Sequence, residues 1–562
     1  MNSRVKYMAK AFVLLSILFI SFAATAQSFT HYDTLRGSLG PGRTWWDVQK
    51  YDLSVKVNPD TKTIQGKNAI TFSIVKPGKH RYMQIDLQKP MEIERIEYAQ
   101  NKYGALPFRR EGNVYFIDFG EREFTTSTGK ADFHTLIVHY KGKPRAAVNA
   151  PWDGGWIWAS DEKGRPWITV ACQGLGASVW FPCKDHQSDE PQYGATLSIN
   201  VPQPLVAVGN GRLKSTKQLA DSTSTWTWEV TNPINNYNIV PYIGYYVNWQ
   251  ETYPGLKGNL DCSYWVLDYN IDKAKKQFGR DVKPMLSCFE KWFGPYPFYE
   301  DSYKMVESSH LGMEHQSAVA YGNKYRDGYL GTDLSGSGWG KKWDYIIIHE
   351  SGHEWFANNI TTNDIADMWV HEGFTDYSEV LFVECQYGKK AADEYCQGLR
   401  KTIQNDRPII GSYGVNKEGS GDMYAKGANL IHTIRQIIGD DEKFKAILTG
   451  MNKEFYHSTV TSAKVEAYII KESGKKLDKV FDQYLRATTI PVLEYKITGK
   501  TVSARWTNCI PGFDMPVKVI VGNKSHWIHP GIAWKAVTIP GFTGTTLNVD
   551  PNFYITVKKV AK

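Results

Sequence analysis

The sequence predicts a multidomain α+β protein with a β-rich N-terminal domain, an α-rich middle domain and a C-terminal β-sandwich. Three observations indicate this arrangement. A chain of 562 residues is too long for a single hydrophobic core. Apolar and polar residues alternate with period two in several runs between residues 51 and 250, whereas helical periodicity dominates after residue 268. Short strand-like runs with Pro and Gly turns return after residue 491.

The first residues have the pattern of an export signal. Basic residues precede an apolar run at 11–23, and the small residues at 24–26 fit a cleavage site. A membrane anchor is the alternative, but the apolar run is short for a span. We therefore predict a cleaved signal peptide at 1–26, a periplasmic or secreted protein, and no stable membrane span.

Composition narrows the possible functions. The net charge is +8, part of it lies in the signal, and no dense Lys/Arg block appears, so nucleic-acid binding is not indicated. The seven cysteines are scattered and none has zinc-site spacing. Cys172 with Cys183, and Cys385 with Cys396, could pair locally, but buried thiols are the simpler interpretation.

The N-terminal domain is predicted to cover residues 27–256 and to be an antiparallel β domain. Residues 51–57 alternate polar and apolar side chains, 58–60 favour a turn, and 69–75 have the pattern of the returning strand. Similar runs recur at 136–140, 195–201 and 224–230.

The middle domain, residues 257–490, is predicted to be helical. An amphipathic pattern runs from Asp272 to Phe293 and ends at a Gly-Pro pair. Further helical stretches follow at 343–358, 370–387 and 427–438. The last domain, residues 491–562, has the short strands of a small β-sandwich.

The segment His349-Glu350-Ser351-Gly352-His353 predicts a metal site. Residues four apart share one face of a helix, so His349 and His353 can both reach one ion. Glu350 lies beside the metal rather than on it, where it can act as general base toward a metal-activated water. The apolar residues 346–348 anchor this helix in a core.

A third metal ligand is predicted at Glu372, because a hydrolytic zinc site needs three protein ligands and one open position. Glu372 begins the next helical stretch, nineteen residues past His353, so a turn between two packed helices would bring it to the metal. Asp376 lies one turn later and is predicted to orient a metal-bound imidazole, with a surface carboxylate as the alternative. Two imidazoles and one carboxylate favour one zinc ion per chain.

Four more segments accompany the metal motif and carry a resemblance to a known family. In chain order they are Gln173 ahead of Pro182-Cys183-Lys184-Asp185, Trp292-Phe293-Gly294-Pro295-Tyr296-Pro297-Phe298, Leu311-Gly312-Met313-Glu314-His315 and Met423-Tyr424-Ala425-Lys426-Gly427-Ala428. Together they resemble the zinc aminopeptidases typified by aminopeptidase N, a family that also includes the leukotriene hydrolases. The resemblance covers nearly the whole mature chain.

This resemblance implies roles for several residues. Glu314 is expected to bind the protonated amine of the substrate, with Gln173 as a neutral helper from the N-terminal domain. Gly312 and Met313 belong to a segment that forms an edge strand in the family, so the peptide is expected to dock by strand addition. Tyr424 is expected to stabilise the oxyanion.

The sequence also departs from the family pattern. Leu311 and His315 replace the family's Gly and Asn, whereas the key Glu is kept. His310 lies where the family lines the pocket for the first side chain, so His310 and His315 are expected to narrow this pocket or make it polar, with surface or packing histidines as the alternative. Larger members carry a helical domain that roofs the site. This sequence ends after the sandwich, so a more open site is expected.

The resemblance thus implies a thermolysin-like catalytic domain and an active site in the cleft between the first two domains. We predict a zinc-dependent aminopeptidase acting on peptides with a free N-terminus. Two alternatives stay open. One is epoxide hydrolysis like that of the leukotriene hydrolases, which an assay on amino-acid amides would separate. The other is a binding protein with a dead site, against which the intact ligands argue. The preferred first residue and the oligomeric state are not predicted.

Overall fold

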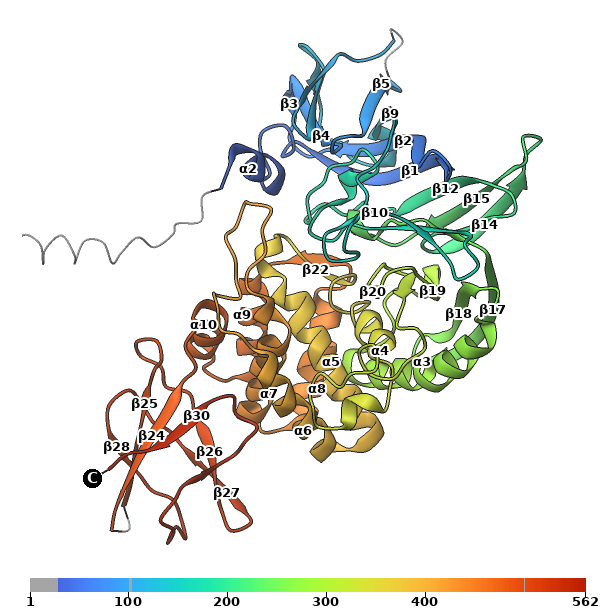
Figure 1. Ribbon diagram of the computed structural model, residues 1–562. Coiled ribbons are helices and arrows are strands. Elements are labelled where there is room, and N and C mark those ends of the chain that lie inside the picture. The colour runs from blue at the N-terminus through green and yellow to red at the C-terminus, as the bar shows by residue number, and fades with distance from the viewer. Residues whose placement is uncertain (1–28, 101–103, 500, 562) are drawn as a thin grey trace, which may run out of the picture.

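The computed structural model describes residues 29–100, 104–499 and 501–561 (Figure 1). A β-rich N-terminal part leads into a helical middle part, and a smaller β part follows, which confirms the predicted fold class. The predicted signal peptide at 1–26 lies outside the described residues. Within those ranges, no helix combines the length and the apolar character that crossing a membrane requires.

The N-terminal domain is built around a seven-stranded sheet. The predicted strands at 51–57 and 69–75 form its antiparallel central pair, joined by a turn near the predicted position. One neighbour departs from the antiparallel expectation, because β12 runs parallel to β1. The strand order is β14 (Arg212–Gln218), β15 (Thr223–Val230), β12 (Ala195–Pro202), β1 (Trp46–Asn58), β2 (Thr63–Ile74), β9 (His134–Gly142) and β5 (Glu92–Tyr98).

Smaller sheets and one short helix complete this domain. Helix α2 (His31–Gly37) begins at a capping box formed by Thr30 and Asp33. Burial alternates residue by residue along β12, as expected for a strand with one face in a core. The smaller sheets are β10 (Gly155–Ser160), β11 (Pro166–Ala171), β16 (Tyr242–Gly244) and β13 (Val206–Val208); β4 (Tyr82–Asp86), β7 (Val114–Asp118) and β6 (Phe108–Glu111); and β3 (Gly78–Lys79) with β8 (Glu123–Phe124).

A five-stranded sheet joins the N-terminal domain to the helices. Its alternate residues face two different cores: Met305 and Val319 pack with the helices, whereas Val306 and Ala320 pack with the N-terminal domain. The predicted boundary at 256–257 falls in the turn of its first hairpin. The order is β17 (Tyr246–Gly255), β18 (Gly258–Leu267), β19 (Tyr303–Glu307), β21 (Val319–Tyr321) and β20 (Gly312–Met313).

The helices of the middle domain pack around α5, below the N-terminal domain in Figure 1. The helices predicted at 272–293, 370–387 and 427–438 correspond to α3, α5 and α7, whereas the one predicted at 343–358 ends earlier. Ala357 has a φ of 141°, which no helix accommodates. The bounds are α3 (Ile271–Phe293), α4 (Tyr345–Gly352), α5 (Trp369–Tyr387), α6 (Lys389–Leu399), α7 (Ala425–Ile438), α8 (Asp441–Glu454), α9 (Ser462–Ser473) and α10 (Asp478–Arg486); β22 (Ile360–Thr362) pairs with β23 (Ser458–Val460).

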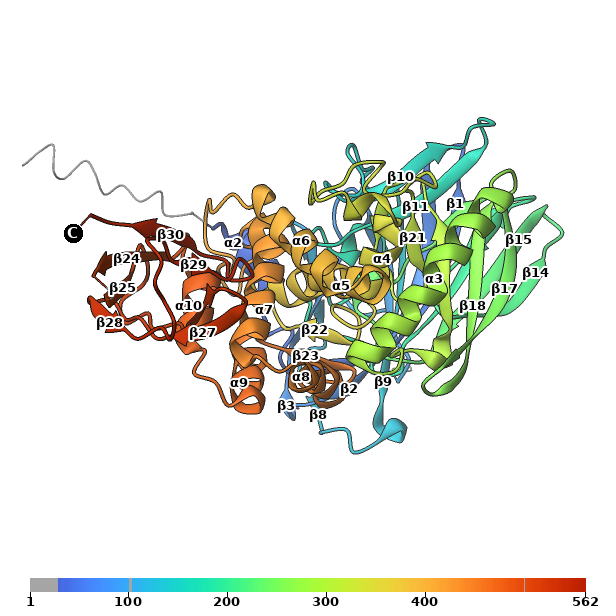
Figure 2. The same ribbon diagram turned by 90° about the horizontal axis from the view of Figure 1, so that it is seen from below.

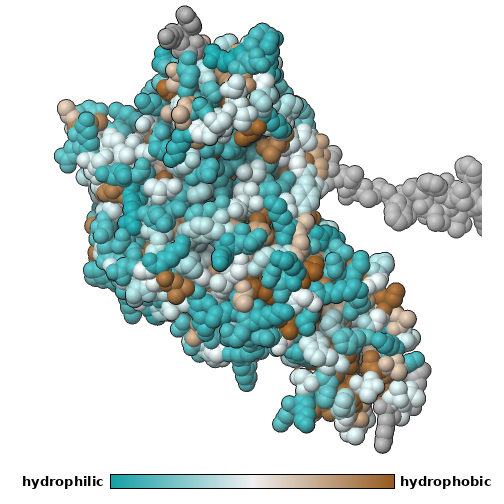
Figure 3. Space-filling model, turned by 180° about the vertical axis from the view of Figure 1, so that it is seen from behind, coloured by the Kyte–Doolittle hydropathy of each residue, from teal (hydrophilic) through white to brown (hydrophobic). Residues whose placement is uncertain are grey.

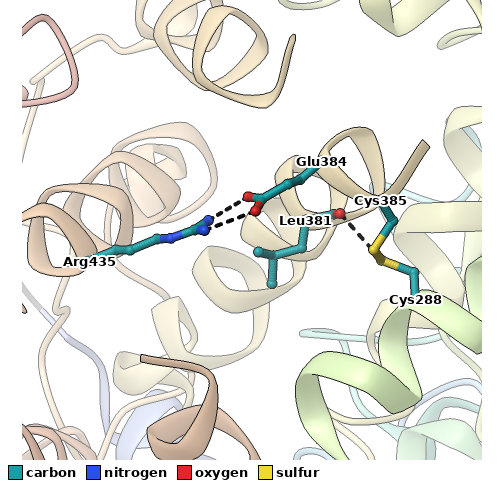
Figure 4. The surroundings of a disulfide bond; sticks show 5 residues. All are labelled: Cys288, Leu381, Glu384, Cys385 and Arg435. Atoms are coloured by element: carbon teal, nitrogen blue, oxygen red, sulfur yellow. Dashed lines mark hydrogen bonds and ion pairs between the residues drawn. A yellow bond between two sulfur atoms is a disulfide. The ribbon is translucent and has the colours of Figure 1, made fainter. Parts of the chain in front are cut away.

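Helix α5 is fixed at its C-terminal end by a disulfide and an ion pair (Figure 4). Cys385 of α5 is bonded to Cys288 of α3. The adjacent Glu384 accepts two hydrogen bonds from Arg435 of α7, at 2.6 and 3.0 Å. The local cysteine pairs considered from the sequence do not form, because Cys172, Cys183 and Cys396 are free and buried.

The C-terminal domain consists of two small sheets that pack on the helical domain (Figure 2). Its core residues Trp506 and Phe513 belong to the same continuous core as the catalytic helices. On the face seen in Figure 3, hydrophobic residues form small separate groups on a mainly hydrophilic surface. The sheets are β28 (Lys535–Val537), β25 (Thr501–Thr507), β24 (Val492–Thr498) and β30 (Thr556–Lys559); and β27 (Lys524–Ile528), β26 (Val517–Val521) and β29 (Asn548–Val549).

Candidate active site

A cleft of about 760 Å³ lies between the N-terminal domain and the catalytic helices. The N-terminal domain contributes the turn 173–175, which follows β11, and the loop 151–153, which precedes β10. The catalytic domain contributes the edge strand β20, helix α4 and the N-terminal ends of α5 and α7. Most residues singled out from the sequence line this cleft.

Helices α4 and α5 bring the three predicted metal ligands together. His349 and His353 lie one turn apart at the end of α4, and Glu372 lies in the first turn of α5. The two histidine Nε2 atoms are 3.3 Å apart, and Glu372 Oε2 lies 3.7 Å from the first and 3.3 Å from the second. Gly352 allows this close packing, because a Cβ there would lie 2.5 Å from Ser378 Oγ of α5.

Hydrogen bonds on the far side of each imidazole fix its orientation. His349 Nδ1 donates to Glu379 Oε1 at 2.6 Å, and His353 Nδ1 donates to the Phe356 carbonyl at 3.0 Å. Both Nε2 atoms are therefore left with a lone pair for an ion. Asp376, the carboxylate predicted for this orienting role, lies farther away, with its Oδ1 3.5 Å from His349 Nδ1.

Glu379 is a functional candidate that the sequence reasoning did not single out. It lies seven residues after Glu372, two turns along the same helix face, so the periodicity of α5 could have revealed it. Tyr395 of α6 donates a hydrogen bond to its second oxygen at 2.6 Å. Glu379 is thus bonded on both sides and is the main partner of His349.

The donor set fits a zinc ion. Two imidazole nitrogens and one carboxylate are ligands that zinc prefers, and three protein ligands leave one position open. Glu372 Oε2 is buried yet makes no hydrogen bond within the described residues, which is costly for a carboxylate unless a cation contacts it. Glu314 and Glu350 lie close to His353, and burial raises the pKa of both carboxyls. This concentration of acidic groups also favours a divalent cation.

Glu350 lies between the metal ligands and the free edge of the five-stranded sheet. Its Oε1 lies so close to Gly312 of β20 that a Cβ there would be only 2.5 Å away, so a side chain at this position would displace the Glu350 carboxylate. Among the described strands, β20 pairs with β21 alone, through Gly312 and Met313. An extended peptide can therefore add to this edge beside the metal ligands.

Glu314, directly after β20, contacts two donors from the N-terminal domain. Its Oε1 accepts hydrogen bonds from Gln173 Nε2 at 2.5 Å and from the Tyr237 hydroxyl at 2.8 Å. Its Oε2 makes no hydrogen bond within the described residues. We call Glu314, Gln173 and Tyr237 the amine anchor, because a buried carboxylate with one free oxygen suits a protonated amine. No local sequence pattern pointed to Tyr237.

Tyr424 precedes α7 and lines the cleft. Its ring stacks on that of His349, with centroids 6.1 Å apart and planes inclined by 20°. Burial raises the pKa of Tyr424 well above its ordinary value, so its hydroxyl stays protonated. The hydroxyl can therefore donate a hydrogen bond at the metal site.

His310 and His315 do not line the cleft. Both are buried, and the His315 ring nitrogen Nδ1 donates to the Tyr242 hydroxyl at 2.6 Å. Burial lowers the pKa of His310 to about 4 and that of His315 still further below its usual range, so both rings are neutral. They are packing histidines, the alternative considered from the sequence. Neither narrows the pocket or makes it polar, contrary to the expectation.

Comparison with protein families gives two matches along the chain. Residues 48–237 match the Peptidase M1 N-terminal domain, and residues 280–484 match the Peptidase family M1 domain. The two matches follow the structural division into a β domain and a helical domain.

Individual relatives are distant. Aminopeptidase N of Lactococcus lactis subsp. lactis is 24% identical over 81% of this chain and 52% of its own length. Probable aminopeptidase 2 of Sulfurisphaera tokodaii is 22% identical over 70% of this chain and 50% of its own length. The chain thus spans about half the length of these curated relatives.

Solved structures show the same fold. An M1 zinc metallopeptidase from Deinococcus radiodurans superposes with a TM-score of 0.67 at 19% identity, covering 80% of this chain and 96% of that one. A mutant of the M1 zinc metallopeptidase from the same organism, bound to a Tyr-Ser-Ala substrate, gives a TM-score of 0.65 at 19% identity, with the same coverage of both chains.

Proposed function

Since the chain belongs to peptidase family M1, the family of aminopeptidase N, we propose that it is a zinc-dependent aminopeptidase that removes N-terminal residues from peptides. The observation that carries this proposal is the amine anchor beside the metal ligands. Glu314 and His353 both belong to one cluster of potential ligand atoms that lie within 4.8 Å of one another. A substrate amine bound to Glu314 would therefore place its first peptide bond at the metal site.

His349, His353 and Glu372 would hold the zinc ion. When bound, zinc supplies Lewis acidity toward the scissile carbonyl and the attacking water. Glu350 takes a proton from that water and passes it to the leaving amine, because its carboxylate lies beside the ligands and along the peptide-binding edge. Tyr424 donates a hydrogen bond to the oxyanion that forms on the carbonyl.

The remaining groups hold the substrate in register. The free edge at Gly312 and Met313 offers backbone hydrogen bonds to an extended peptide. Glu314 Oε2 accepts from the ammonium, while Gln173 and Tyr237 keep the carboxylate in place through its other oxygen. An internal peptide bond offers no ammonium, so it would leave the buried carboxylate unpaired.

A paired-substrate assay tests the proposal. Hydrolysis of aminoacyl fluorogenic amides should stop when a chelator removes the metal and return when zinc is added. Acetylation of the same substrates should lower turnover to a small residual rate. Hydrolysis that persists in protein shown by metal analysis to be metal-free would contradict the metal-dependent mechanism.

We further propose that the protein is exported through a signal peptide at residues 1–26. The basic and apolar pattern of this segment supports the proposal, and so does the Cys288–Cys385 disulfide, because disulfides persist in oxidising compartments. N-terminal sequencing of protein from an extracytoplasmic fraction should begin near residue 27. Recovery of the uncleaved chain in the cytoplasm would contradict it.

A further inference from the structure

We infer that Trp152 is a specificity residue, whose indole ring forms part of the wall that contacts the first side chain of the substrate. It would favour a large apolar or aromatic residue at that position. The inference rests on the proposed aminopeptidase function, and it adds a residue that no sequence motif singled out.

Trp152 lies exposed at the cleft. Its side chain is 64% exposed, and it lines the cleft together with Pro151 and Asp153. Single exposed apolar residues are common on protein surfaces, so exposure alone carries no argument. Trp152 is distinguished by the rigidity of its loop and by the position of that loop.

The loop that presents Trp152 is fixed by its own hydrogen bonds. The carboxylate of Asp153 accepts from the backbone N–H groups of Val148 and Asn149, at 2.7 and 2.9 Å. The N–H of Gly154 donates to the Pro151 carbonyl at 3.1 Å, which closes the turn around Trp152. A fixed loop presents the ring without a large loss of entropy on binding, so contacts to it contribute fully to affinity.

The position of the loop is set by the turn that carries the amine anchor. Gly154 packs against Leu175 so closely that a Cβ on it would lie 2.8 Å from the Leu175 Cβ. Leu175 lies two residues after Gln173 and also lines the cleft. Trp152, two residues before Gly154, and Leu175 thus line the cleft from two segments that touch, and we call this pair the apolar wall.

This wall is within reach of the first side chain of a bound peptide. The amine and the first side chain are attached to the same Cα, so a side chain next to a bound amine extends from a point beside Glu314. An apolar side chain that covers the indole removes apolar area from water, and an aromatic one can also stack on it. Among the cleft-lining side chains of the N-terminal domain, Pro151, Trp152 and Leu175 are the apolar ones.

Positively charged side chains in the cleft would instead favour an acidic first residue of the substrate. Arg36 already donates hydrogen bonds to the carbonyls of Gly174 and Leu175, and it lies 3.6 Å from Asp185. Its positive charge is therefore already paired with groups of the protein. Lys417 is exposed and makes no ion pair within the described residues, so water and salt screen its charge. Arg407, the third basic residue of the lining outside the metal site, pairs with Asp406 at 3.1 Å. The apolar wall is therefore the stronger determinant.

The test compares substrates that differ only in the first residue. The kcat/KM values of alanyl, leucyl, phenylalanyl and glutamyl fluorogenic amides are measured for the native enzyme and for Trp152→Ala, Trp152→Phe and Val148→Ala. Val148 is the matched control, because it lies in the same loop, is 94% exposed and does not line the cleft. Thermal melting verifies that every variant is folded.

The native enzyme should prefer phenylalanyl over alanyl substrates, and Trp152→Ala should lower this ratio about tenfold. Trp152→Phe should keep most of the ratio, and Val148→Ala should leave it unchanged. An unaltered ratio in Trp152→Ala, or a native preference for the glutamyl substrate, would overturn the inference while aminopeptidase activity stands.

Absence of turnover on every substrate would instead reject the proposed function. Calorimetric titration with phenylalanine amide and alanine amide then tests whether Trp152 contacts the first side chain. Tighter binding of phenylalanine amide to the native protein than to Trp152→Ala would support the role inferred for Trp152. Equal affinities would overturn that inference.

Discussion

Replacing Glu314 by Gln removes the charge of the amine anchor while keeping its shape. Oε1 of the native carboxylate is occupied by Gln173 and Tyr237, so the expected loss is confined to the contact between Oε2 and the substrate ammonium. Glu314 is only 3% exposed, so this contact would form away from bulk water.

The size of the effect follows from that burial. Removing one partner of a buried, hydrogen-bonded charge pair costs about 2 to 5 kcal/mol. The carboxylates of Glu350 and Glu372 lie near Glu314 and would still attract the ammonium after the substitution. We therefore take about 3 kcal/mol, which is roughly a hundredfold loss in kcat/KM. Acetylated substrates never form the contact, so their already low rates should change little.

The assay is the ratio of kcat/KM values for the free and the acetylated forms of one peptide. The ratio should be large for the native enzyme and about a hundredfold smaller for Glu314→Gln. Gln173→Ala serves as the milder comparison, because it removes a neutral donor and leaves the charge in place. Efficient internal cleavage of acetylated peptides by the native enzyme would refute the reasoning.

Four further predictions concern the metal site and its supports. Glu350→Gln should retain one zinc per chain by metal analysis, yet lose roughly two to four orders of magnitude in kcat; near-normal turnover would exclude it as the base. Tyr424→Phe should lower kcat roughly a hundredfold with little change in KM if its hydroxyl acts on the transition state, as we propose; an effect on KM alone would assign it to binding. Glu379→Gln should weaken zinc affinity about 10- to 100-fold, and Asp376→Asn less, in a chelator competition; the opposite order would restore Asp376 as the orienting residue. Cys385→Ser opens a crosslink between residues 97 apart in sequence, and chemical denaturation should show a loss of about 4 to 5 kcal/mol; unchanged stability would show that the bond does not form.

The metal ligands could be predicted from the sequence because their geometry is largely local. His349 and His353 share a helix face by spacing alone, and Glu372 lies at the start of the next helix. The same periodicity also places Glu379 on this face of α5, but Asp376, which is closer to Glu372 in sequence, was assigned the orienting role instead. The end of α4 at Gly352 and the positive φ at Ala357, which excludes a helix through residue 358, were not predicted from the periodicity of this stretch.

Other parts of the site depend on contacts between distant segments. Tyr237 reaches Glu314 across 77 positions of sequence, and no pattern around either residue indicates it. His310 and His315 show the opposite case, since they flank the edge strand in sequence but are buried away from the cleft. Trp152 lies in a loop whose position is set by its packing on Leu175, which only the tertiary structure reveals.

The amine anchor crosses the interface between two hydrophobic cores. Gln173 and Tyr237 come from the N-terminal domain, whereas Glu314 follows a strand of the sheet that supports the metal-bearing helices. Binding of an amine at Glu314 would therefore be thermodynamically linked to the association of the two domains, because the complete anchor exists only where the domains are in contact. Any ligand with a free amine should consequently protect the N-terminal domain against unfolding, although that domain holds none of the three metal ligands. With the site filled, the two domains should then unfold as one cooperative unit, because the bound amine would add a contact between them.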